Sequence, residues 1–584
     1  MAQDLTVEFG QILETPTVFP DEQGQLEVTV TNQGDEDATD ATLNLYASTD
    51  TELDDEVLNT ITDTISRPEG DNTRPEIPDG EIDALRGTDE LLGTISGVNL
   101  AAGEVNTFTI DFASEEFRTA SVVSPGAYNL IAEIDDDSTA DDEGNNQAVE
   151  FISEDDAVLV WNSTFLNAVQ AEGKAGNGVA PPLEARNAAI LHTAIYDSVY
   201  ALSDDPRSTG IAELPDTPEG ASQEAAAVGA AYSTLTALFP NQQAAFNVQR
   251  DRSLAEINDD PAAEQAGFDF GVEVAQAIVQ ARSNDGADQA QVDYTPGTAA
   301  GDYQEVKEPV PSEPLPPEEL LNEEGLVENT ALLPNFGRVI PFGIDSTANF
   351  LPPGPPAFSS PNYANDIEEV RLHGGLVDTD VTTVERTEEE TEIAQFWSYD
   401  REDTFRPPGQ WNEIAQEVAL DQDNSLEENA LLFAKLNVAM ADAGIVAWDG
   451  KYAFEQLRPV TAIRNADDDN NPATNVDPEW EPLIDTPDFP DYISGHATFG
   501  GAAAGILEDF FGEDVTQFEI PSQELPGVSR EFISSSDGSS FRQAAIENAD
   551  SRLFGGVHVD ISNVDGVAIG FDVADSVNES DLFI

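Results

Sequence analysis

The spacing of apolar residues changes once along this chain of 584 residues, close to residue 157. Before that point, apolar residues alternate with polar ones, which is the period of half-buried β-strands. Beyond it, they recur every three or four residues in alanine-rich segments, which is the period of packed α-helices. We therefore expect a multidomain protein, with an all-β sandwich over residues 1–153 and a large all-α helical bundle over residues 157–584.

The first domain is predicted to be an immunoglobulin-like sandwich, because several short strands in this length are typical of that fold. Its alternating segments are residues 5–9, 26–30, 41–45, 108–112 and 128–134. Short motifs at 30–34 (Val-Thr-Asn-Gln-Gly), 48–50 (Ser-Thr-Asp) and 143–146 (Glu-Gly-Asn-Asn) resemble those of CARDB adhesion modules.

An acidic stretch at 135–145 could bind calcium in this domain, since calcium prefers carboxylate oxygens. The stretch lacks the spaced ligands and the closing glutamate of a full calcium loop. A solvated turn without an ion is therefore the favoured interpretation, and calcium is the alternative.

Four helices are predicted in the second domain, at residues 181–202, 222–239, 263–283 and 427–449. Phe239-Pro240 and Asp285-Gly286 have the composition of helix ends. In the last of these segments, an apolar stripe from Leu432 to Val446 indicates a packed helix and says nothing about function.

The net charge restricts the partners of this protein. With 115 acidic and 23 basic residues, the formal charge is −92. Such a surface repels nucleic acid and anionic membranes, so we expect neither as a partner. No segment approaches the roughly 20 apolar residues of a membrane span. The charge favours adaptation to high salt or to a calcium-containing exterior over a merely soluble surface.

We expect a secreted or extracellular protein, although residues 1–7 lack the charged and apolar regions of a signal peptide. The alternative is the cytoplasm of a salt-accumulating halophile. The chain has no cysteine, which excludes disulfides and thiolate metal sites. It has only two methionines, and few oxidisable sulfurs would suit exposure to a strong oxidant.

Basic residues and two of the four histidines gather in three short segments near the C-terminus. The segments are 451–459 (Lys-Tyr-Ala-Phe-Glu-Gln-Leu-Arg-Pro), 494–496 (Ser-Gly-His) and 551–558 (Ser-Arg-Leu-Phe-Gly-Gly-Val-His). Positive charge collected in so acidic a chain predicts a site for a tetrahedral anion. Separate structural roles for each segment are the alternative.

In the first segment, a spacing of seven would place Lys451 and Arg458 on nearly the same helix face, with Pro459 ending or bending the helix. The two cations could instead pair with Glu455 or another carboxylate. In the third segment, Arg552 and His558 are six residues apart. The two glycines between them can break the helix, so that both side chains converge.

In the second segment, Ser494 is a favoured helix cap and Gly495 lets the backbone approach a ligand closely. A helix N-terminus binds oxyanions readily. His496 would then act as an acid or base with its charge balance near neutral pH, unless it only caps the helix. Together the segments predict a trigonal-bipyramidal oxyanion centre, with cations around its equator and histidines at its apices.

The motifs Lys-x6-Arg-Pro, Ser-Gly-His and Ser-Arg-x5-His, in this order, resemble the signature of the vanadium-dependent haloperoxidases and the related acid phosphatases. The resemblance extends over most of 157–584 and includes Trp448-Asp-Gly-Lys-Tyr and Trp480-x-Pro-Leu-Ile. The size of the domain and these intervening motifs favour the haloperoxidase branch.

The resemblance implies a vanadate cofactor and a role for each matching residue. The residues that would hold the vanadate oxygens are Lys451, Arg458, Ser494, Gly495 and Arg552. His558 would bind vanadium, and His496 would assist peroxide activation as an acid or base. Phe489 and Trp448 would line the halide pocket.

The sequence departs from the family pattern at two positions. Ile493 stands where the family usually has proline, and Ser562 stands where an aspartate often orients the vanadium-binding histidine. Asp560 or Asp565 is expected to substitute for that aspartate. His192 and His373 fall outside the three segments, and we assign them structural roles.

The leading hypothesis is an enzyme, a vanadate-dependent haloperoxidase that oxidises halide with hydrogen peroxide to hypohalous acid, which then halogenates small organic molecules. One alternative is an acid phosphatase in which His558 forms a phosphohistidine and His496 protonates the leaving group. The other is a non-enzymatic, secreted adhesion protein that binds phosphate. A homo-oligomer is compatible with the sequence, which specifies neither the oligomeric state nor the halide.

Overall fold

The computed structural model describes most of the chain. The described residues are 5–14, 23–32, 38–48, 89–113, 127–135, 147–153, 156–297, 301–304, 307–309, 326–328, 331–422, 424–512, 514–525, 528–536 and 538–583. The chain divides into two compact units. One comprises Met1–Ser163, Gln416–Asp423 and Ile520–Arg530, and the other comprises Thr164–Ala415, Asn424–Glu519 and Glu531–Ile584. The predicted domain limits, 1–153 and 157–584, stay a prediction.

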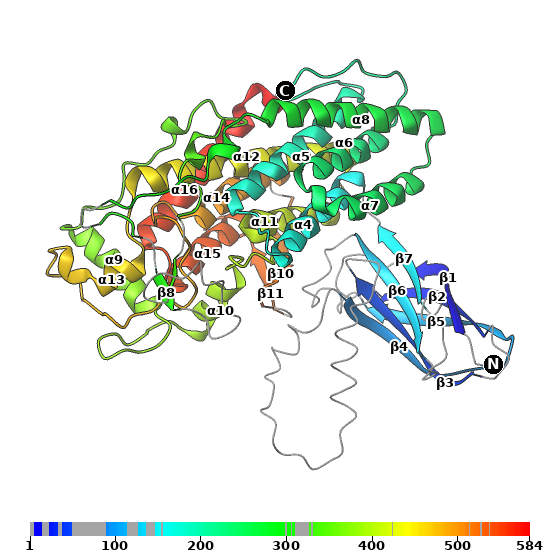
Figure 1. Ribbon diagram of the computed structural model, residues 1–584, viewed down its shortest axis with the longest axis horizontal. Coiled ribbons are helices and arrows are strands. Elements are labelled where there is room, and N and C mark those ends of the chain that lie inside the picture. The colour runs from blue at the N-terminus through cyan, green and yellow to red at the C-terminus, as the bar shows by residue number, and fades with distance from the viewer. Residues whose placement is uncertain are drawn as a thin grey trace, which may run out of the picture. The chain divides into compact units, whose positions relative to one another are not determined.

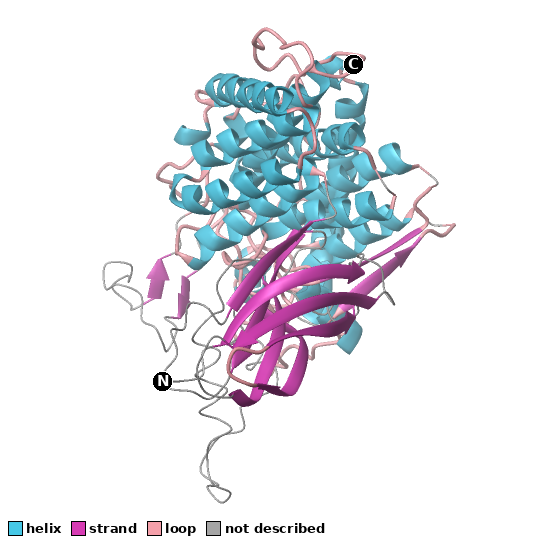
Figure 2. Ribbon diagram, turned by 90° about the vertical axis from the view of Figure 1, so that its right-hand side faces the viewer, coloured by secondary structure: helices cyan, strands magenta, loops and turns pink. Residues whose placement is uncertain are grey.

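The first unit contains two antiparallel sheets, whose strands are magenta in Figure 2. The strand orders are β1-β2-β5 and β4-β3-β6-β7. The strands are β1 (Leu5–Glu14), β2 (Gln23–Asn32), β3 (Ala38–Ser48), β4 (Asp89–Leu100), β5 (Val105–Ala113), β6 (Ala127–Asp135) and β7 (Gln147–Ser153). Val28 and Val30 from one sheet and Leu43 and Leu45 from the other belong to one buried cluster. The predicted all-β sandwich is confirmed, since alternate residues of both sheets share a core.

The acidic stretch 135–145, for which a solvated turn is favoured and calcium is the alternative, lies outside the described residues except for Asp135. Within the described residues, no group of three or more acidic or histidine side chains is arranged to hold a metal ion.

The helical part of the chain follows the sandwich (Figure 1). Its helices in the described residues are α4 (Ala157–Lys174), α5 (Pro181–Ala201), α6 (Gln223–Leu238), α7 (Gln243–Glu256), α8 (Pro261–Arg282), α9 (Pro361–His373), α10 (Glu388–Phe396), α11 (Arg406–Asp421), α12 (Leu426–Phe454), α13 (Pro459–Arg464), α14 (Gly495–Phe511), α15 (Ser540–Phe554) and α16 (Asp560–Glu579). Short strands, β8 (Lys307–Pro309) with β9 (Leu326–Glu328) and β10 (Gln517–Pro521) with β11 (Ser529–Ile533), form two small hairpin-like pairs. The four predicted helices are confirmed as α5, α6, α8 and α12.

The central helix of the bundle is α12, which packs against α5, α14 and α16. A capping box starts it, because Ser425 Oγ accepts from the Glu428 N–H and Glu428 accepts from the Ser425 N–H. The predicted stripe from Leu432 to Val446 is buried, and so are most residues of its other faces. α12 is long and apolar enough to cross a membrane, but 89 % of its most apolar window is buried inside the protein, as in a core helix.

Glycine allows α14 and α16 to approach each other closely. A Cβ on Gly501 would lie 2.3 Å from the carbonyl oxygen of Val567, and one on Gly570 would lie 2.4 Å from that of Thr498. At the start of α14, the Ser494 N–H donates to the Ser562 carbonyl of α16 over 3.0 Å. This packing fixes the N-terminus of α14 relative to the start of α16, where the second and third basic segments lie.

Candidate oxyanion site

The first basic segment forms a helix end, a turn and a new helix start. α12 ends at Phe454, and Glu455 takes the left-handed conformation with φ 48°. Arg458 is the extended N-cap residue of α13, and Pro459 opens that helix, a position that proline favours. The prediction that Lys451 and Arg458 share a helix face is therefore wrong. The turn nevertheless brings both cations to one aromatic ring, that of Phe489, at 4.6 Å and 4.7 Å from its centroid.

Neither cation is paired with Glu455 among the described contacts. Lys451 Nζ donates to the backbone carbonyls of Pro490 (3.0 Å), Asp491 (3.1 Å) and Ile493 (2.5 Å). Burial and Arg458 lower the pKa of Lys451 well below its usual value. Three carbonyl acceptors still favour the ammonium form, which alone has three hydrogens. In this geometry, Lys451 can donate to an oxyanion only by releasing one of these carbonyls.

Arg458 also holds the loop that precedes α14. Its Nε donates to the Phe489 carbonyl and its Nη1 to the Val557 carbonyl, each over 2.6 Å. Its third nitrogen, Nη2, is buried and has no hydrogen-bond partner among the described residues.

The second segment starts α14 as predicted. Ser494 is the N-cap residue, and its Oγ accepts from the Ala497 N–H at 3.5 Å. His496 Nε2 lies 2.9 Å from the Ser398 carbonyl oxygen. A carbonyl can only accept, so Nε2 carries the proton and Nδ1 is left as an acceptor.

Burial and the neighbouring Arg552 lower the pKa of His496 to about 3. The expected charge balance near neutral pH is therefore wrong for this geometry. A bound anion would raise the pKa, because negative charge favours the imidazolium.

The third segment breaks at its two glycines, as predicted. α15 ends at Phe554, Gly556 takes φ 79°, and the N–H groups of Val557 and His558 both donate to the Arg552 carbonyl. The tight turn brings His558 back toward the first segment, so that its Nε2 lies 3.1 Å from Arg458 Nη1.

Arg552 is paired on one side only. Its Nη2 donates to Asp400 Oδ2 over 2.5 Å, whereas its Nε and Nη1 are buried without a partner among the described residues. Burial raises the pKa of Asp400, but Arg552 and His496 together bring it below the usual value. Asp400 is therefore an ionised partner that fixes one edge of the guanidinium.

The carboxylate at His558 comes from an unexpected position. His558 Nδ1 is hydrogen-bonded to Asp491 Oδ1. Asp565 instead accepts from the Tyr492 hydroxyl, and Asp560 lies at the start of α16 without a described bond to His558. The expectation that Asp560 or Asp565 orients this histidine is wrong.

Three buried guanidinium nitrogens of this candidate site have no partner among the described residues: Arg458 Nη2, Arg552 Nε and Arg552 Nη1. Buried charged donors without acceptors are costly, and they are rare in native proteins unless a ligand or water satisfies them. A tetrahedral oxyanion would supply acceptors for all three. It would also lie close to the helix N-terminus and to His558 Nε2. The residues present therefore fit vanadate or phosphate.

An aromatic wall borders the cations. The Phe489 and Trp448 rings have their centroids 5.0 Å apart, and the Phe489 side chain is almost buried. Trp448 Nε1 donates to the Leu332 carbonyl over 3.2 Å, which fixes its ring. An apolar wall beside buried cations excludes water and leaves the positive charge for an anion.

Comparisons with known proteins relate the helical part of the chain to the vanadium haloperoxidases. The family model of the second helical-bundle domain of vanadium chloroperoxidase (VCPO) matches residues 431–581. The vanadium chloroperoxidase of Curvularia inaequalis is 29 % identical over 483 residues, which cover 69 % of this chain and 78 % of that protein. The crystal structure of a bacterial vanadium-dependent iodoperoxidase superposes with a TM-score of 0.58 at 26 % identity, covering 72 % of this chain and 96 % of that one. The helical part of this chain has the vanadium haloperoxidase fold and is similar in sequence to these enzymes.

The fold of the family recurs in a bacterial vanadium-dependent chloroperoxidase, with a TM-score of 0.52, 17 % identity, and coverage of 68 % of this chain and 91 % of that one. The N-terminal part is a CARDB domain, whose family model matches residues 2–150. The family relatives are thus named for two different halides, chloride and iodide.

Sequence reasoning identified the three basic segments of this candidate site but missed Asp491, Asp400 and Ser398. No local signal marks the two aspartates, because carboxylates are abundant throughout the chain, and Ser398 contributes a backbone carbonyl, which every residue has. Only their distance to Arg552, His496 and His558 distinguishes them.

The other two histidines lie elsewhere, in structural positions. The His192 ring stacks on Phe433 with centroids 5.2 Å apart, and burial lowers its pKa to about 3. His373 Nδ1 lies 3.7 Å from Glu390 Oε2.

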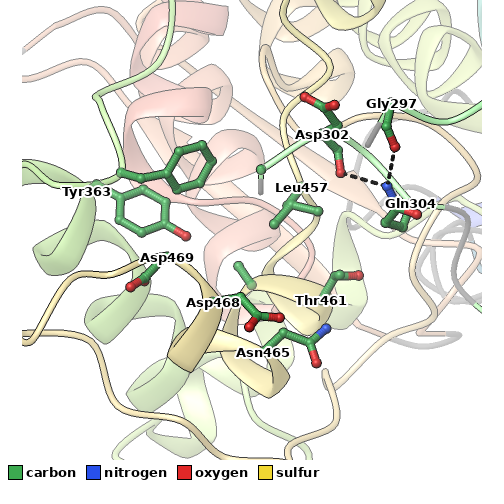
Figure 3. A pocket seen from close by; sticks show the side chains of 12 residues that line it. Gly297, Asp302, Gln304, Tyr363, Leu457, Thr461, Asn465, Asp468 and Asp469 are labelled. Carbon is green, nitrogen blue, oxygen red and sulfur yellow. Dashed lines mark hydrogen bonds between the residues drawn. The ribbon is translucent and has the colours of Figure 1, made fainter. Parts of the chain in front are cut away.

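A cavity of about 560 Å³ opens beside α13, lined on one side by Leu457 (Figure 3). Asp302, Asp468 and Asp469 line it, and the described residues of its lining include no lysine or arginine. None of the predicted site residues borders it. Carboxylates repel halides and oxyanions, so we do not assign this cavity to the candidate oxyanion site.

Proposed function

We propose that this protein is a vanadate-dependent haloperoxidase that oxidises halide with hydrogen peroxide to hypohalous acid. In the balanced reaction, halide, hydrogen peroxide and one proton give hypohalous acid and water. The observation that carries the proposal is the set of three buried nitrogens of Arg458 and Arg552 that have no partner among the described residues, in a chain that resembles the vanadium haloperoxidases.

We assign vanadate to this position. Arg458 and Arg552 would bind its oxygens through those nitrogens, and Ser494, Gly495 and Lys451 would contribute a hydroxyl, a backbone N–H and charge. His558 Nε2 would be the metal ligand. Bound vanadate would supply a Lewis acid for peroxide that need not change its oxidation state.

His496 would handle the proton in this proposal. Its Nε2–H is held by the Ser398 carbonyl, so Nδ1 is the nitrogen that accepts a proton from peroxide and later returns it to form water. Asp400 would keep the Arg552 guanidinium oriented throughout. The lowered pKa of His496 favours the neutral base at the start of the cycle.

Halide would approach beside Phe489 and Trp448, where the positive charge of Lys451 and Arg458 lies behind the aromatic wall. Hypohalous acid formed there would halogenate small organic molecules. Chloride, bromide and iodide all carry the same charge, so this geometry does not select among them.

The test is an assay of the apoprotein with bromide and hydrogen peroxide, with and without added vanadate, using bromination of phenol red. We expect activity only with vanadate. We expect His558→Ala to reduce it roughly a thousandfold or more, because the metal ligand is lost.

Phosphomonoester hydrolysis without vanadate, together with no bromination, would instead identify a phosphatase. That alternative rests on the same geometry, since phosphate has the same shape and His558 Nε2 could act as its nucleophile. Phosphate binding without either activity would indicate the non-enzymatic adhesion protein.

A further inference from the structure

Two hydrogen bonds determine which nitrogen of His558 carries the proton. On one side, Nε2 lies 3.1 Å from Arg458 Nη1, and a guanidinium can only donate. Nε2 must therefore be the acceptor. On the other side, Nδ1 is bonded to Asp491, whose carboxylate accepts. Both contacts require the same tautomer, with the hydrogen on Nδ1 and the lone pair on Nε2.

Asp491 is fixed by its own backbone. Its N–H donates to the Gln456 carbonyl over 3.1 Å, and its carbonyl accepts from both Lys451 Nζ and Ser562 Oγ, each at 3.1 Å. Its side chain and that of His558 are 0 % and 1 % exposed. The carboxylate therefore reaches Nδ1 from a rigid loop, with little freedom to move away.

Ser562 occupies the position from which the resemblance expects an aspartate to act. Its Oγ lies 3.3 Å from His558 Nδ1, at the outer limit of a hydrogen bond, and donates instead to the Asp491 carbonyl. Its backbone carbonyl is engaged by Ser494. The hydroxyl at 562 thus supports the loop that carries Asp491.

We propose that Asp491 is the positioning residue of His558, and that it replaces in this chain the carboxylate that residue 562 would provide. The proposal rests on the assigned role of His558 as the vanadium ligand. Asp491 holds the imidazole in the tautomer that keeps the lone pair on Nε2, which Arg458 Nη1 has to release before Nε2 can bind a ligand. Without it, the imidazole could place a hydrogen on Nε2, opposite the Arg458 donor, and lose its ligand atom.

If Asp491 has this role, a carboxylate at either position 491 or position 562 should be able to orient His558. Asp491→Ala should remove this carboxylate, and Asp491→Ala combined with Ser562→Asp should restore one at Nδ1 from α16. Ser562→Ala removes one of the hydrogen bonds to the loop, whose other bonds to Gln456 and Lys451 keep the Asp491 carboxylate at Nδ1. Asp565→Asn removes a nearby charge that contacts Tyr492 and not His558, so it is the matched control.

The first readout is the His558 tautomer in the full-length apoprotein, from long-range proton–nitrogen correlation spectra with labelled histidine. With four histidines in the chain, the signals can be assigned by single replacements. We expect the Nδ1–H form in the wild type, in S562A and in D565N. We expect a mixture or the Nε2–H form in D491A, and return of the Nδ1–H form in the double variant.

The second readout is vanadate affinity by calorimetry. We expect D491A to weaken it roughly 10- to 100-fold, the range seen for partners that orient a metal-ligating histidine, and the double variant to recover most of this loss. S562A and D565N should stay within about threefold of the wild type. Should D491A fail to fold, D491N replaces it, with a weaker acceptor of the same shape and a loss of roughly tenfold.

An unchanged tautomer and unchanged vanadate affinity in folded D491A or D491N would overturn the proposal. So would a double variant that folds but remains as weak as D491A. If the tautomer and affinity change as expected but no variant or wild type brominates, Asp491 still positions His558, and only the proposed activity fails.

Discussion

Two neutral imidazoles present different nitrogens to the proposed oxyanion site. His496 carries its hydrogen on Nε2 because the Ser398 carbonyl accepts there, whereas His558 carries it on Nδ1 because Asp491 accepts there. Burial lowers the pKa of both rings. His558 thus keeps its lone pair on Nε2, where Arg458 donates to it, and His496 keeps its lone pair on Nδ1, although both side chains are the same residue type.

At the residue scale, His192 gives a prediction for stability against pH. Burial lowers its pKa from about 6.5 to about 3, so the folded state excludes a proton that the unfolded state binds below pH 6.5. Stability is therefore lost as the pH falls from 6.5 toward 3. We therefore compare the free energy of unfolding at pH 7 and at pH 5. We expect it to fall by about 2 kcal/mol less in His192→Leu than in the wild type.

The measurement is denaturant unfolding of the helical signal at both pH values. Phe433→Leu, which removes the ring stacked on His192 but keeps the imidazole, is the control. It should lower stability at both pH values and retain the wild-type loss on acidification. If H192L and the wild type lost the same unfolding free energy on acidification, this account would be contradicted.

Residue chemistry explains which parts of the site the sequence predicted. The cations, the Ser494 cap and both histidines stand out because basic residues are scarce. Asp491 does not stand out among the 115 acidic residues, and its distance of 67 positions from His558 hides their contact. No sequence signal marks the turn at Glu455 either, because glutamate occupies a left-handed conformation that usually requires glycine.

At the element scale, the site depends on three helix boundaries. α12 ends before Arg458, α14 begins at Gly495 and α15 ends before Gly555. The three- to four-residue spacing of apolar residues predicted the long helices, because each of these helices buries one face over several turns. It did not predict how α13 starts or how the segments meet, since those depend on contacts between distant residues.

A substitution at Gly556 tests whether the third boundary, the end of α15, is important for the site. Its φ is 79°, and a Cβ there would lie 2.3 Å from the Gly374 carbonyl oxygen. We expect Gly556→Ala to cost about 3 kcal/mol of unfolding free energy and to weaken vanadate binding, because the backbone that carries His558 must shift. Chemical denaturation and calorimetry measure the two effects.

Gly176 is the matched control, since its φ is 75° and a Cβ there would meet nothing within 4 Å. Gly176→Ala should cost only about 1 kcal/mol, the conformational part, and leave vanadate binding unchanged. If both variants lost the same unfolding free energy, the close approach to Gly374 would have no role in stability.

At the scale of the whole molecule, the site and the rest of the chain have opposite charge. Lys451, Arg458 and Arg552 are fully buried together, while the chain as a whole carries a formal charge of −92. In the proposed reaction, a halide ion must therefore cross a repulsive field before it reaches a local positive potential. This charge also motivates the proposals of a secreted protein or of a salt-accumulating cytoplasm, between which the charge does not discriminate.

The repulsive field predicts how the reaction depends on salt. Raising the ionic strength from about 10 mM to about 200 mM shortens the Debye length from roughly 30 Å to less than 10 Å and screens the distant surface charges. The buried cations are screened much less, so halide should reach them more easily. We expect the KM for bromide to fall several-fold in added sodium acetate, with little change in kcat.

Hydrogen peroxide is uncharged, so its KM in the same titration is an internal control and should stay constant. A bromide KM that does not respond, or a peroxide KM that falls in parallel, would mean that long-range charge does not govern halide access.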